Sequence, residues 1–241
     1  MRRAALGLML ALAPLAAGCD SKRAKAAAGD AGFPPPARPV ARIVSERWST
    51  EAARDRLGEA RAVMDRAGIR RNMTVADIGA GEGYYTVRLA GRVEPKGRVL
   101  AEDVESATRD RLAERVARER LDNVSVRLGL ADDPRLPAAS FDRILMIHMY
   151  HEIAQPFAFL WRMRPALRPD GLVVVVDPDR APDRHGMPPA LLDCEFRAVG
   201  YERVSRALVP QAQGYLTLYR AVGPRPAPEA IRPCDAAGRV L

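Results

Sequence analysis

The stretch Val75-Ala76-Asp77-Ile78-Gly79-Ala80-Gly81-Glu82-Gly83-Tyr84-Tyr85 leads from a short apolar run, through three glycines, into a segment of helical character. Glycines let the backbone turn sharply and approach a ligand closely, and the helix start behind them offers N–H donors. Their spacing is Gly-x-Gly-x-Gly, whereas dinucleotide-binding folds use Gly-x-Gly-x-x-Gly. Asp77 stands two residues before the first glycine, and its charge would repel a pyrophosphate. The stretch therefore predicts a strand, a turn and a helix that bind a ligand with positive charge.

Similar apolar runs recur along the chain, and they are typical of strands buried on both faces of a parallel sheet. They cover residues 74–78, 99–101, 124–128, 144–147 and 172–176. Helical patterns lie between or after them, at residues 109–120, 158–167 and 189–199. Ser49 or Thr50 is expected to cap an earlier helix that runs to about Ala67 and ends at Gly68.

Two late strands, at residues 201–208 and 214–221, have no helix between them, which predicts an antiparallel hairpin at the sheet edge. With the alternating strands and helices before it, this hairpin predicts an α/β fold. We expect a doubly wound, mostly parallel, seven-stranded sheet with an antiparallel edge.

Four motifs in order resemble those of the class I S-adenosylmethionine-dependent methyltransferases, over roughly residues 50–221. The first motif of that family, Asp-x-Gly-x-Gly-x-Gly after a strand, is matched by Asp77, Gly79, Gly81 and Gly83. The other three motifs are matched by residues 98–104 (RVLAEDV), 128–145 (LGLADDPRLPAASFDRIL) and 167–177 (LRPDGLVVVVD). The resemblance implies the Rossmann-like methyltransferase fold and S-adenosylmethionine as cofactor.

The resemblance also assigns cofactor contacts to acidic residues. Asp103 ends the second strand, where the family places an acid that accepts both ribose hydroxyls, and Glu102 is adjacent. The family often has an acid near the adenine where this chain has Leu130. Asp132 and Asp133 follow, and the sequence leaves open which of them meets the adenine amino group.

The acceptor side is predicted from residues 148–152 (HMYHE), which follow the fourth parallel strand, where this family faces its substrate. An oxygen or nitrogen acceptor needs a base with a pKa near neutrality, which histidine has. His148 and His151 are therefore the candidate catalytic residues, for an unidentified small-molecule acceptor. The alternative is that they bond locally and pack. His185 lies in a later loop. It either closes over the site or is an ordinary loop residue without a role in the site.

The N-terminus predicts export. Residues 1–18 have a positive start and an apolar run that ends in small residues, which indicates a signal peptide. Cys19 then resembles the lipidated cysteine of a bacterial lipoprotein, and Asp20 behind it suggests retention at the inner membrane, on its periplasmic side. We expect a Pro/Ala-rich tether at 19–42, a methyltransferase-like domain at 43–222 and a Pro-rich disordered tail at 223–241.

Charge and cysteine content limit the possible partners. The formal net charge is +8, but arginines alternate with acids along the chain, so we expect solvated surface and no nucleic-acid partner. Besides Cys19, the chain has Cys194 and Cys234. An oxidising compartment permits a disulfide between them but does not imply one. No cysteine spacing indicates zinc, and we expect no metal.

The predicted location and cofactor conflict, because S-adenosylmethionine is made in the cytoplasm. The leading hypothesis is an exported, membrane-tethered enzyme that methylates a small molecule. The alternative is a lipoprotein binding or accessory domain that keeps the fold without catalysis. If the start site is misassigned, the protein is cytoplasmic. An NAD-dependent oxidoreductase does not fit the glycine spacing, and the oligomeric state is open.

Overall fold

The computed structural model describes residues 32–43 and 50–241. The predicted signal peptide, Cys19, Asp20 and the first part of the tether lie outside the described residues. Within the described ranges, no helix is both long and apolar enough to cross a bilayer.

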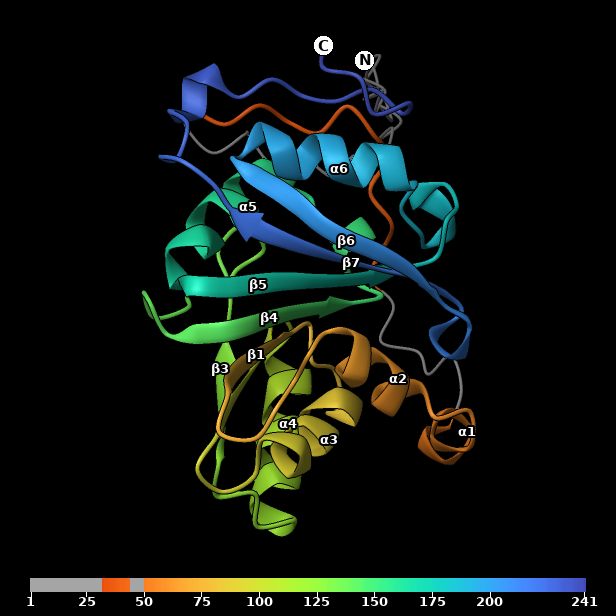
Figure 1. Ribbon diagram of the computed structural model, residues 1–241, viewed down its shortest axis with the longest axis vertical. Helices are drawn as coiled ribbons and strands as arrows, with labels where there is room; N and C mark the ends of the chain where they lie inside the picture. Colours follow the sequence, from red (N-terminus) through yellow and green to blue (C-terminus); the bar gives the residue numbers. More distant parts are fainter. Residues whose placement is uncertain (1–31, 44–49) are drawn as a thin grey trace, which may run out of the picture.

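Seven strands form one sheet in the order β3-β2-β1-β4-β5-β7-β6 (Figure 1). The strands are β1 Thr74–Ile78, β2 Arg98–Asp103, β3 Val124–Leu128, β4 Phe141–Ile147, β5 Leu167–Asp177, β6 Tyr201–Val209 and β7 Gly214–Ala221. Strands β1 to β5 pair in parallel, and β7 is antiparallel to both β5 and β6. The predicted fold class and the antiparallel edge are therefore confirmed.

Helices cover both faces of the sheet (Figure 1). They are α1 Glu51–Arg56, α2 Glu59–Arg66, α3 Tyr84–Val93, α4 Ser106–Arg118, α5 Pro156–Met163 and α6 Pro189–Ala198. Short 3-10 turns are η1 Tyr150–Glu152, η2 Arg164–Ala166, η3 Pro182–Arg184, η4 Pro210–Ala212 and η5 Pro228–Ala230. Side chains of α5 and α6 pack in one hydrophobic cluster, and those of α2 and α3 pack in a second. Because successive strand residues alternate between these clusters, the central strands are buried on both faces.

The single helix predicted from residue 50 to 67 is wrong in one respect. Gly58 has a left-handed φ of 67° and separates α1 from α2. The predicted ends hold: the Thr50 hydroxyl accepts the Ala53 N–H at 3.2 Å, and Gly68 follows α2 with φ 64°. Glycine adopts this conformation without steric cost, so a helical pattern can break there.

The described part of the predicted tether packs on the domain. Phe33 is buried, and its ring lies 5.6 Å from that of Trp161 on α5. Arg38 donates through Nε to Glu195 on α6 at 2.8 Å, with both side chains fully buried. Prolines exclude helix and central strand from this segment, but they do not prevent an extended chain from burying its apolar side chains.

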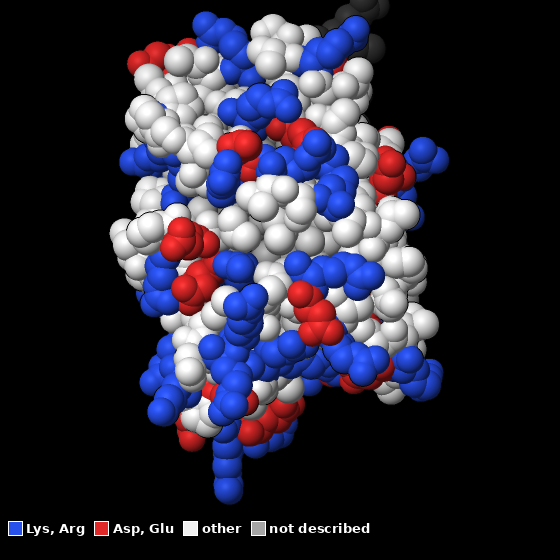
Figure 2. Space-filling view, viewed as in Figure 1, with Lys and Arg blue, Asp and Glu red and all other residues white. Residues whose placement is uncertain are grey.

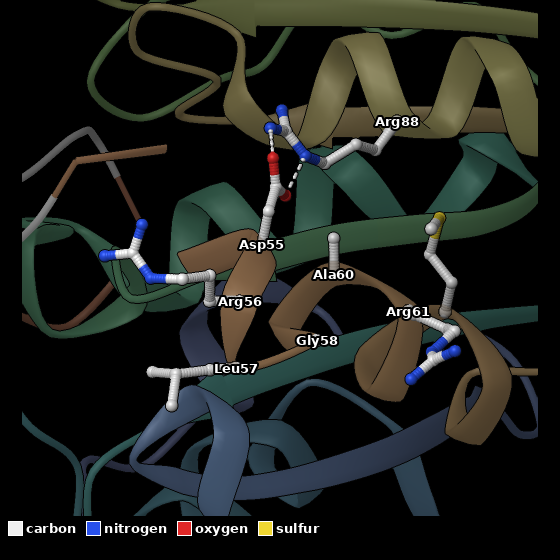
Figure 3. A pocket seen from close by; sticks show the side chains of 8 residues that line it. Asp55, Arg56, Leu57, Gly58, Ala60, Arg61 and Arg88 are labelled. Atoms are coloured by element: carbon white, nitrogen blue, oxygen red, sulfur yellow. Dashed lines mark hydrogen bonds and ion pairs between the residues drawn. The ribbon is translucent and has the colours of Figure 1, made fainter. Parts of the chain in front are cut away.

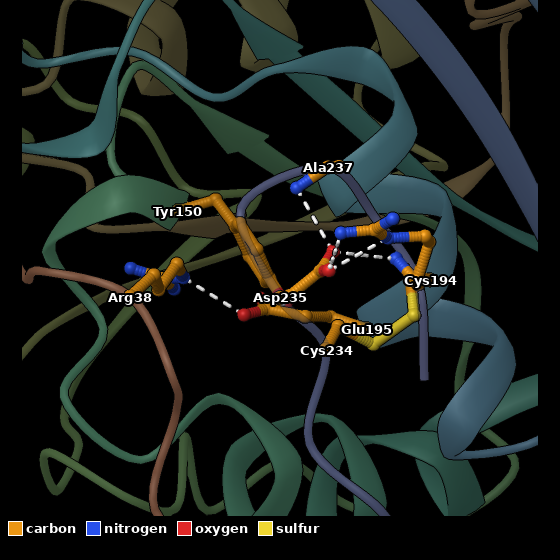
Figure 4. Close-up of a disulfide and its surroundings, with 8 residues drawn as sticks. Arg38, Tyr150, Cys194, Glu195, Cys234, Asp235 and Ala237 are labelled. Carbon is orange, nitrogen blue, oxygen red and sulfur yellow. Dashed lines mark hydrogen bonds and ion pairs between the residues drawn. A yellow bond between two sulfur atoms is a disulfide. The ribbon is translucent and has the colours of Figure 1, made fainter. Parts of the chain in front are cut away.

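The tail is ordered against α5 and α6, which corrects the predicted disordered segment at 223–241. Cys234 forms a disulfide with Cys194 on α6, and both cysteines are buried (Figure 4). Ile231 is also buried, and the Trp161 indole N–H donates to the Pro226 carbonyl at 2.9 Å. The domain therefore includes residues 32–43 and 223–241, and Figure 1 shows these two segments beside α6.

Candidate functional site

The predicted site residues lie where the parallel strands end. Strand β1 stands between β2 and β4, so the chain order reverses direction between β1 and β4. Ligands of open α/β sheets bind at the carboxyl ends of the strands beside such a reversal. The turn after β1 carries the glycines, and the turn after β4 carries the two candidate histidines.

All three glycines of the turn after β1 have left-handed backbone conformations. The φ values are 64° for Gly79, 57° for Gly81 and 90° for Gly83. A Cβ at Gly83 would lie 2.5 Å from Leu112 of α4, and one at Gly79 would lie 3.1 Å from Met149. A Cβ at Gly81 would meet no atom within 4 Å. Gly79 and Gly83 therefore serve close packing as well, whereas Gly81 borders open space that suits a ligand.

Asp103 is the last residue of β2 and faces this turn. Its Oδ2 accepts the N–H of Gly81 at 3.0 Å, and its Oδ1 accepts the N–H of Glu105 at 2.9 Å. The side chain is mostly buried, with 7% of the residue exposed. Each carboxylate oxygen keeps a second lone pair for another donor. The carboxylate thus lies beside the open space at Gly81, and its assignment to the ribose hydroxyls stays a prediction.

Two more carboxyl groups are buried beside Asp103. Burial is the main cause that raises the pKa of Glu102 to about 8, and the charge of Asp103 adds to it. Burial likewise raises the pKa of Asp77 to about 6, although the Thr86 hydroxyl donates to it at 2.6 Å. The Glu102 carboxyl lies so close to Gly129 that a Cβ there would stand 1.6 Å from its Oε1. The site thus gathers three acidic groups and favours a ligand with positive charge.

Asp132 and Asp133 lie in the turn after β3. The Asp132 carboxylate is paired with Arg162 of α5, and Asp133 Oδ1 accepts the N–H of Arg135 at 2.7 Å. Leu130 is 43% exposed in the same turn. Both acids therefore have protein partners already, and the choice between them for adenine stays a prediction.

His148 directly follows β4, as predicted. It has a left-handed φ of 55°, and its N–H donates to the Val176 carbonyl at 2.8 Å, which extends the pairing of β4 with β5. Such a conformation is costly for a residue with a Cβ, and it occurs mostly where surrounding structure enforces it. The residue is half-buried, and burial lowers the pKa of its imidazole. The neutral ring is therefore the dominant form at pH 7.

His151 lies on η1 and is only 1% exposed. Its Nδ1 is 2.7 Å from Oδ1 of Asp177, the fully buried last residue of β5. Asp177 was not among the predicted site residues. The available signal was its place at the end of the strand next to β4, because parallel neighbours end at the same edge of the sheet.

The aromatic pair that begins α3 serves packing. The Tyr84 ring lies between the guanidinium groups of Arg54 and Arg88, 3.6 Å and 3.8 Å from its centroid. The Tyr85 hydroxyl donates to Glu59 at 2.9 Å.

A separate pocket of about 410 Å³ lies between the α1–α2 turn and α3. Figure 3 shows Arg88 of α3 bonded to Asp55 at its wall. Its lining residues are Asp55, Arg56, Leu57, Gly58, Ala60, Arg61, Met64 and Arg88. Because none of these is a predicted site residue, this pocket is distinct from the glycine turn.

Comparison with known proteins agrees with this geometry. Residues 75–171 match the family model described as a methyltransferase domain. A curated relative, nocamycin O-methyltransferase of Saccharothrix syringae, is 31% identical over 153 residues. That match spans 64% of this chain and 52% of the relative, so the chain spans about half of the relative's length.

Solved structures share the fold. An S-adenosylmethionine-dependent methyltransferase from Aquifex aeolicus is similar with a TM-score of 0.61 and 22% identity, over 71% of this chain and 97% of that one. The CcbJ methyltransferase from Streptomyces caelestis is similar with a TM-score of 0.57 and 15% identity, over 73% of this chain and all of that one. Residues 75–171 are thus similar to a methyltransferase domain, and the chain has the fold of these solved methyltransferases.

Proposed function

We propose that this protein transfers a methyl group from S-adenosylmethionine to an oxygen atom of a small molecule. The observation that carries the proposal is the turn at Gly81, which borders open space while its N–H is held by Asp103. Burial is the main cause of the raised pKa values of Asp77 and Glu102, and repulsion by the charge of Asp103 adds to both. A cofactor with a sulfonium and an ammonium group would relieve that repulsion.

Residue roles follow from the geometry. When bound, S-adenosylmethionine supplies a methyl carbon that is activated for in-line displacement. Asp77 and Asp103 would hold the cationic end and the ribose, and the Gly81 turn would leave room for the ligand. We assign proton acceptance from the acceptor hydroxyl to His148, because its ring is neutral at pH 7 and less buried than that of His151.

The oxygen acceptor is suggested by the relative named nocamycin O-methyltransferase. A hydroxyl becomes a better nucleophile as it loses its proton, so a positioned neutral imidazole contributes about 10²–10⁴ in rate. Methyl transfer is measured as S-adenosylhomocysteine formed with a panel of phenols and alcohols. We expect turnover with at least one acceptor and a loss of that size in His148→Asn.

The control for His148→Asn is cofactor affinity, which should not change. A loss in turnover below about threefold at equal affinity would remove the base assignment and leave alignment of the partners as the source of acceleration. Cofactor binding without turnover on any acceptor would favour the alternative of an accessory domain.

We further propose that the protein is exported and anchored by lipid on Cys19 at the periplasmic side of the inner membrane. The disulfide between Cys194 and Cys234 supports this, because disulfides persist in oxidising compartments. Metabolic labelling with a palmitate analogue should mark the wild type and not Cys19→Ser. The label should stay with membranes in high salt, since screening releases proteins that adhere by charge alone. An unlabelled, cytoplasmic wild type would contradict export.

A further inference from the structure

Three side chains with metal-binding atoms meet on the acceptor side of the site. His151 and Glu152 belong to η1 after β4, and His185 directly follows η3 after β5. Their ligand atoms all lie within 4.8 Å of one another. We infer that these three residues bind a divalent transition-metal ion, for which Zn²⁺ is the best fit. This inference does not depend on methyl transfer, and it differs from the expectation from sequence of no metal site.

The His151 ring is oriented as metal-bound histidines usually are. Its Nδ1 lies 2.7 Å from the Asp177 carboxylate, which can only accept, so the hydrogen is on Nδ1 and the Nε2 lone pair is available. Nε2 is buried and has no hydrogen-bond partner among the described residues. A buried polar atom without a partner destabilises the folded state. A cation at Nε2 would complete the carboxylate–histidine–metal arrangement that fixes the ring of a ligand.

The donor set and its spacing fit zinc. Two imidazoles and one carboxylate are a known ligand set of open zinc sites, with a fourth position for another molecule. Ligand atoms on a tetrahedral zinc ion lie roughly 3.3 Å apart. Here Glu152 Oε1 is 4.0 Å from His151 Nε2 and 3.9 Å from His185 Nδ1. Small rotations of the Glu152 and His185 side chains, which are 15% and 26% exposed, would close the remaining gap.

The main chain around the cluster is held in place. The Arg38 guanidinium donates to the His151 carbonyl at 3.3 Å, and the Arg180 guanidinium donates to the His185 carbonyl at 3.0 Å. The rings of His151 and His185 stand edge to face, 5.4 Å apart. Because both ligand segments are fixed before the ion arrives, little chain ordering opposes binding.

Zn²⁺ titration of residues 20–241 at neutral pH, without reductant, tests the site by calorimetry and by competition with a chromogenic chelator. The disulfide must be intact, since free thiolates would bind zinc themselves. We expect one ion per chain. His185→Asn and Glu152→Gln should each weaken binding by at least about tenfold, since each removes one of three ligands. His148→Asn is the matched control, because His148 is the one histidine of the chain outside the proposed ligand set, and its loss should not affect binding.

Co²⁺ absorption provides a second measurement, because a tetrahedral site gives intense visible bands that octahedral Co²⁺ in water lacks. Those bands on the wild type, lost in His185→Asn and kept in His148→Asn, would support the site. Equal Zn²⁺ affinity in wild type, His185→Asn and Glu152→Gln would overturn it. So would an affinity loss in His148→Asn as large as in the ligand variants.

Discussion

Arg38 Nε donates to Glu195 Oε1 at 2.8 Å across 157 residues of sequence, and solvent reaches neither side chain. The other oxygen of Glu195 accepts the Tyr150 hydroxyl at 2.7 Å, so the carboxylate is bonded on both sides. Figure 4 shows its bond with Arg38. The main chain beside Arg38 also contacts the acceptor side, because the Ala41 N–H donates to the His151 carbonyl at 3.1 Å. The segment expected to be a tether therefore supports the wall that carries the candidate catalytic residues.

Arg38→Ala is predicted to lower the free energy of unfolding by about 3–5 kcal/mol, because it leaves Glu195 buried without its counter-charge. Urea denaturation of residues 20–241 measures this. Arg42→Ala, at an exposed position four residues on, is the control and should change stability by less than about 0.5 kcal/mol. Equal stability of the two variants would show that the segment does not pack on α6.

Removal of the disulfide is predicted to loosen the chain end. Cys194 and Cys234 are 40 residues apart, and a bridge over such a loop stabilises by about 2–4 kcal/mol. The double variant Cys194→Ala/Cys234→Ala should lose stability of that size and expose Trp161, which the tail covers through the Pro226 carbonyl. Denaturation followed by tryptophan fluorescence reports both effects. Unchanged fluorescence in the double variant would mean that the tail stays in place without the bridge.

The glycine turn gives a prediction that separates folding from binding. Gly81→Ala places a Cβ in open space, so its folding cost is limited to the left-handed conformation, about 1–2 kcal/mol. It should nevertheless weaken S-adenosylhomocysteine binding, because the Cβ enters the space assigned to the ligand. Gly83→Ala should cost more stability, since its Cβ would clash with Leu112 at 2.5 Å. Thermal denaturation and calorimetry distinguish the two, and a Gly81→Ala variant with wild-type affinity would make the turn purely structural.

The raised pKa of Glu102 predicts a pH dependence of the cofactor-free protein. Its carboxyl titrates near pH 8 when folded and near its ordinary 4.5 when unfolded, so between these values the folded state holds more protons. Stability must then fall as pH rises, by about 1–2 kcal/mol between pH 6.5 and 8.5. Glu102→Gln should flatten that slope in chemical denaturation at a series of pH values. A wild-type slope that is flat or rising would contradict the assignment of a protonated Glu102.

Much of the fold followed from local patterns. The bounds of β1, β3 and β7 were predicted to the residue. Strand β1 is a short buried apolar run, as predicted, whereas β3 lies at the sheet edge and alternates half-buried and exposed residues. Strands β2, β4 and β5 proved longer than predicted, since their ends carry charged residues such as Arg98 and Asp177. Charged side chains at strand ends leave no apolar signal, although the backbone still pairs.

The two segments wrongly predicted to be a tether and a disordered tail show a different limit of prediction from sequence. The Pro-rich segments at 32–43 and 223–241 have no periodicity, so sequence reasoning predicted a tether and a tail. Their packing depends on single anchors, Phe33 and the Cys194–Cys234 bridge, whose partners lie far away in the sequence. Pairing over such separations is decided by tertiary structure and cannot be read from local composition.

The candidate site was predicted only in part, because some of its contacts also join residues that are far apart in the sequence. The glycines follow β1, and Asp103 ends the neighbouring parallel strand β2. Both positions were predicted from sequence motifs, so their contact could be expected. The contacts of His151 with Asp177, and its approach to Glu152 and His185, join turns after two different strands. Sequence placed His151 and Glu152 next to each other but gave no measure of their distance to His185.

Cofactor binding at the turn between Gly81 and Asp103 is the central claim, and isothermal titration of residues 20–241 with S-adenosylmethionine and S-adenosylhomocysteine tests it most directly. NAD serves as the control ligand, because the glycine spacing disfavours a dinucleotide. The account predicts one binding site per chain for both S-adenosyl compounds, none for NAD, and a loss of about 1.5–3 kcal/mol in Asp103→Ala, the scale of hydrogen bonds to a charged group. A folded wild type that binds neither S-adenosyl compound, or an Asp103→Ala variant that binds them as tightly as wild type, would contradict it.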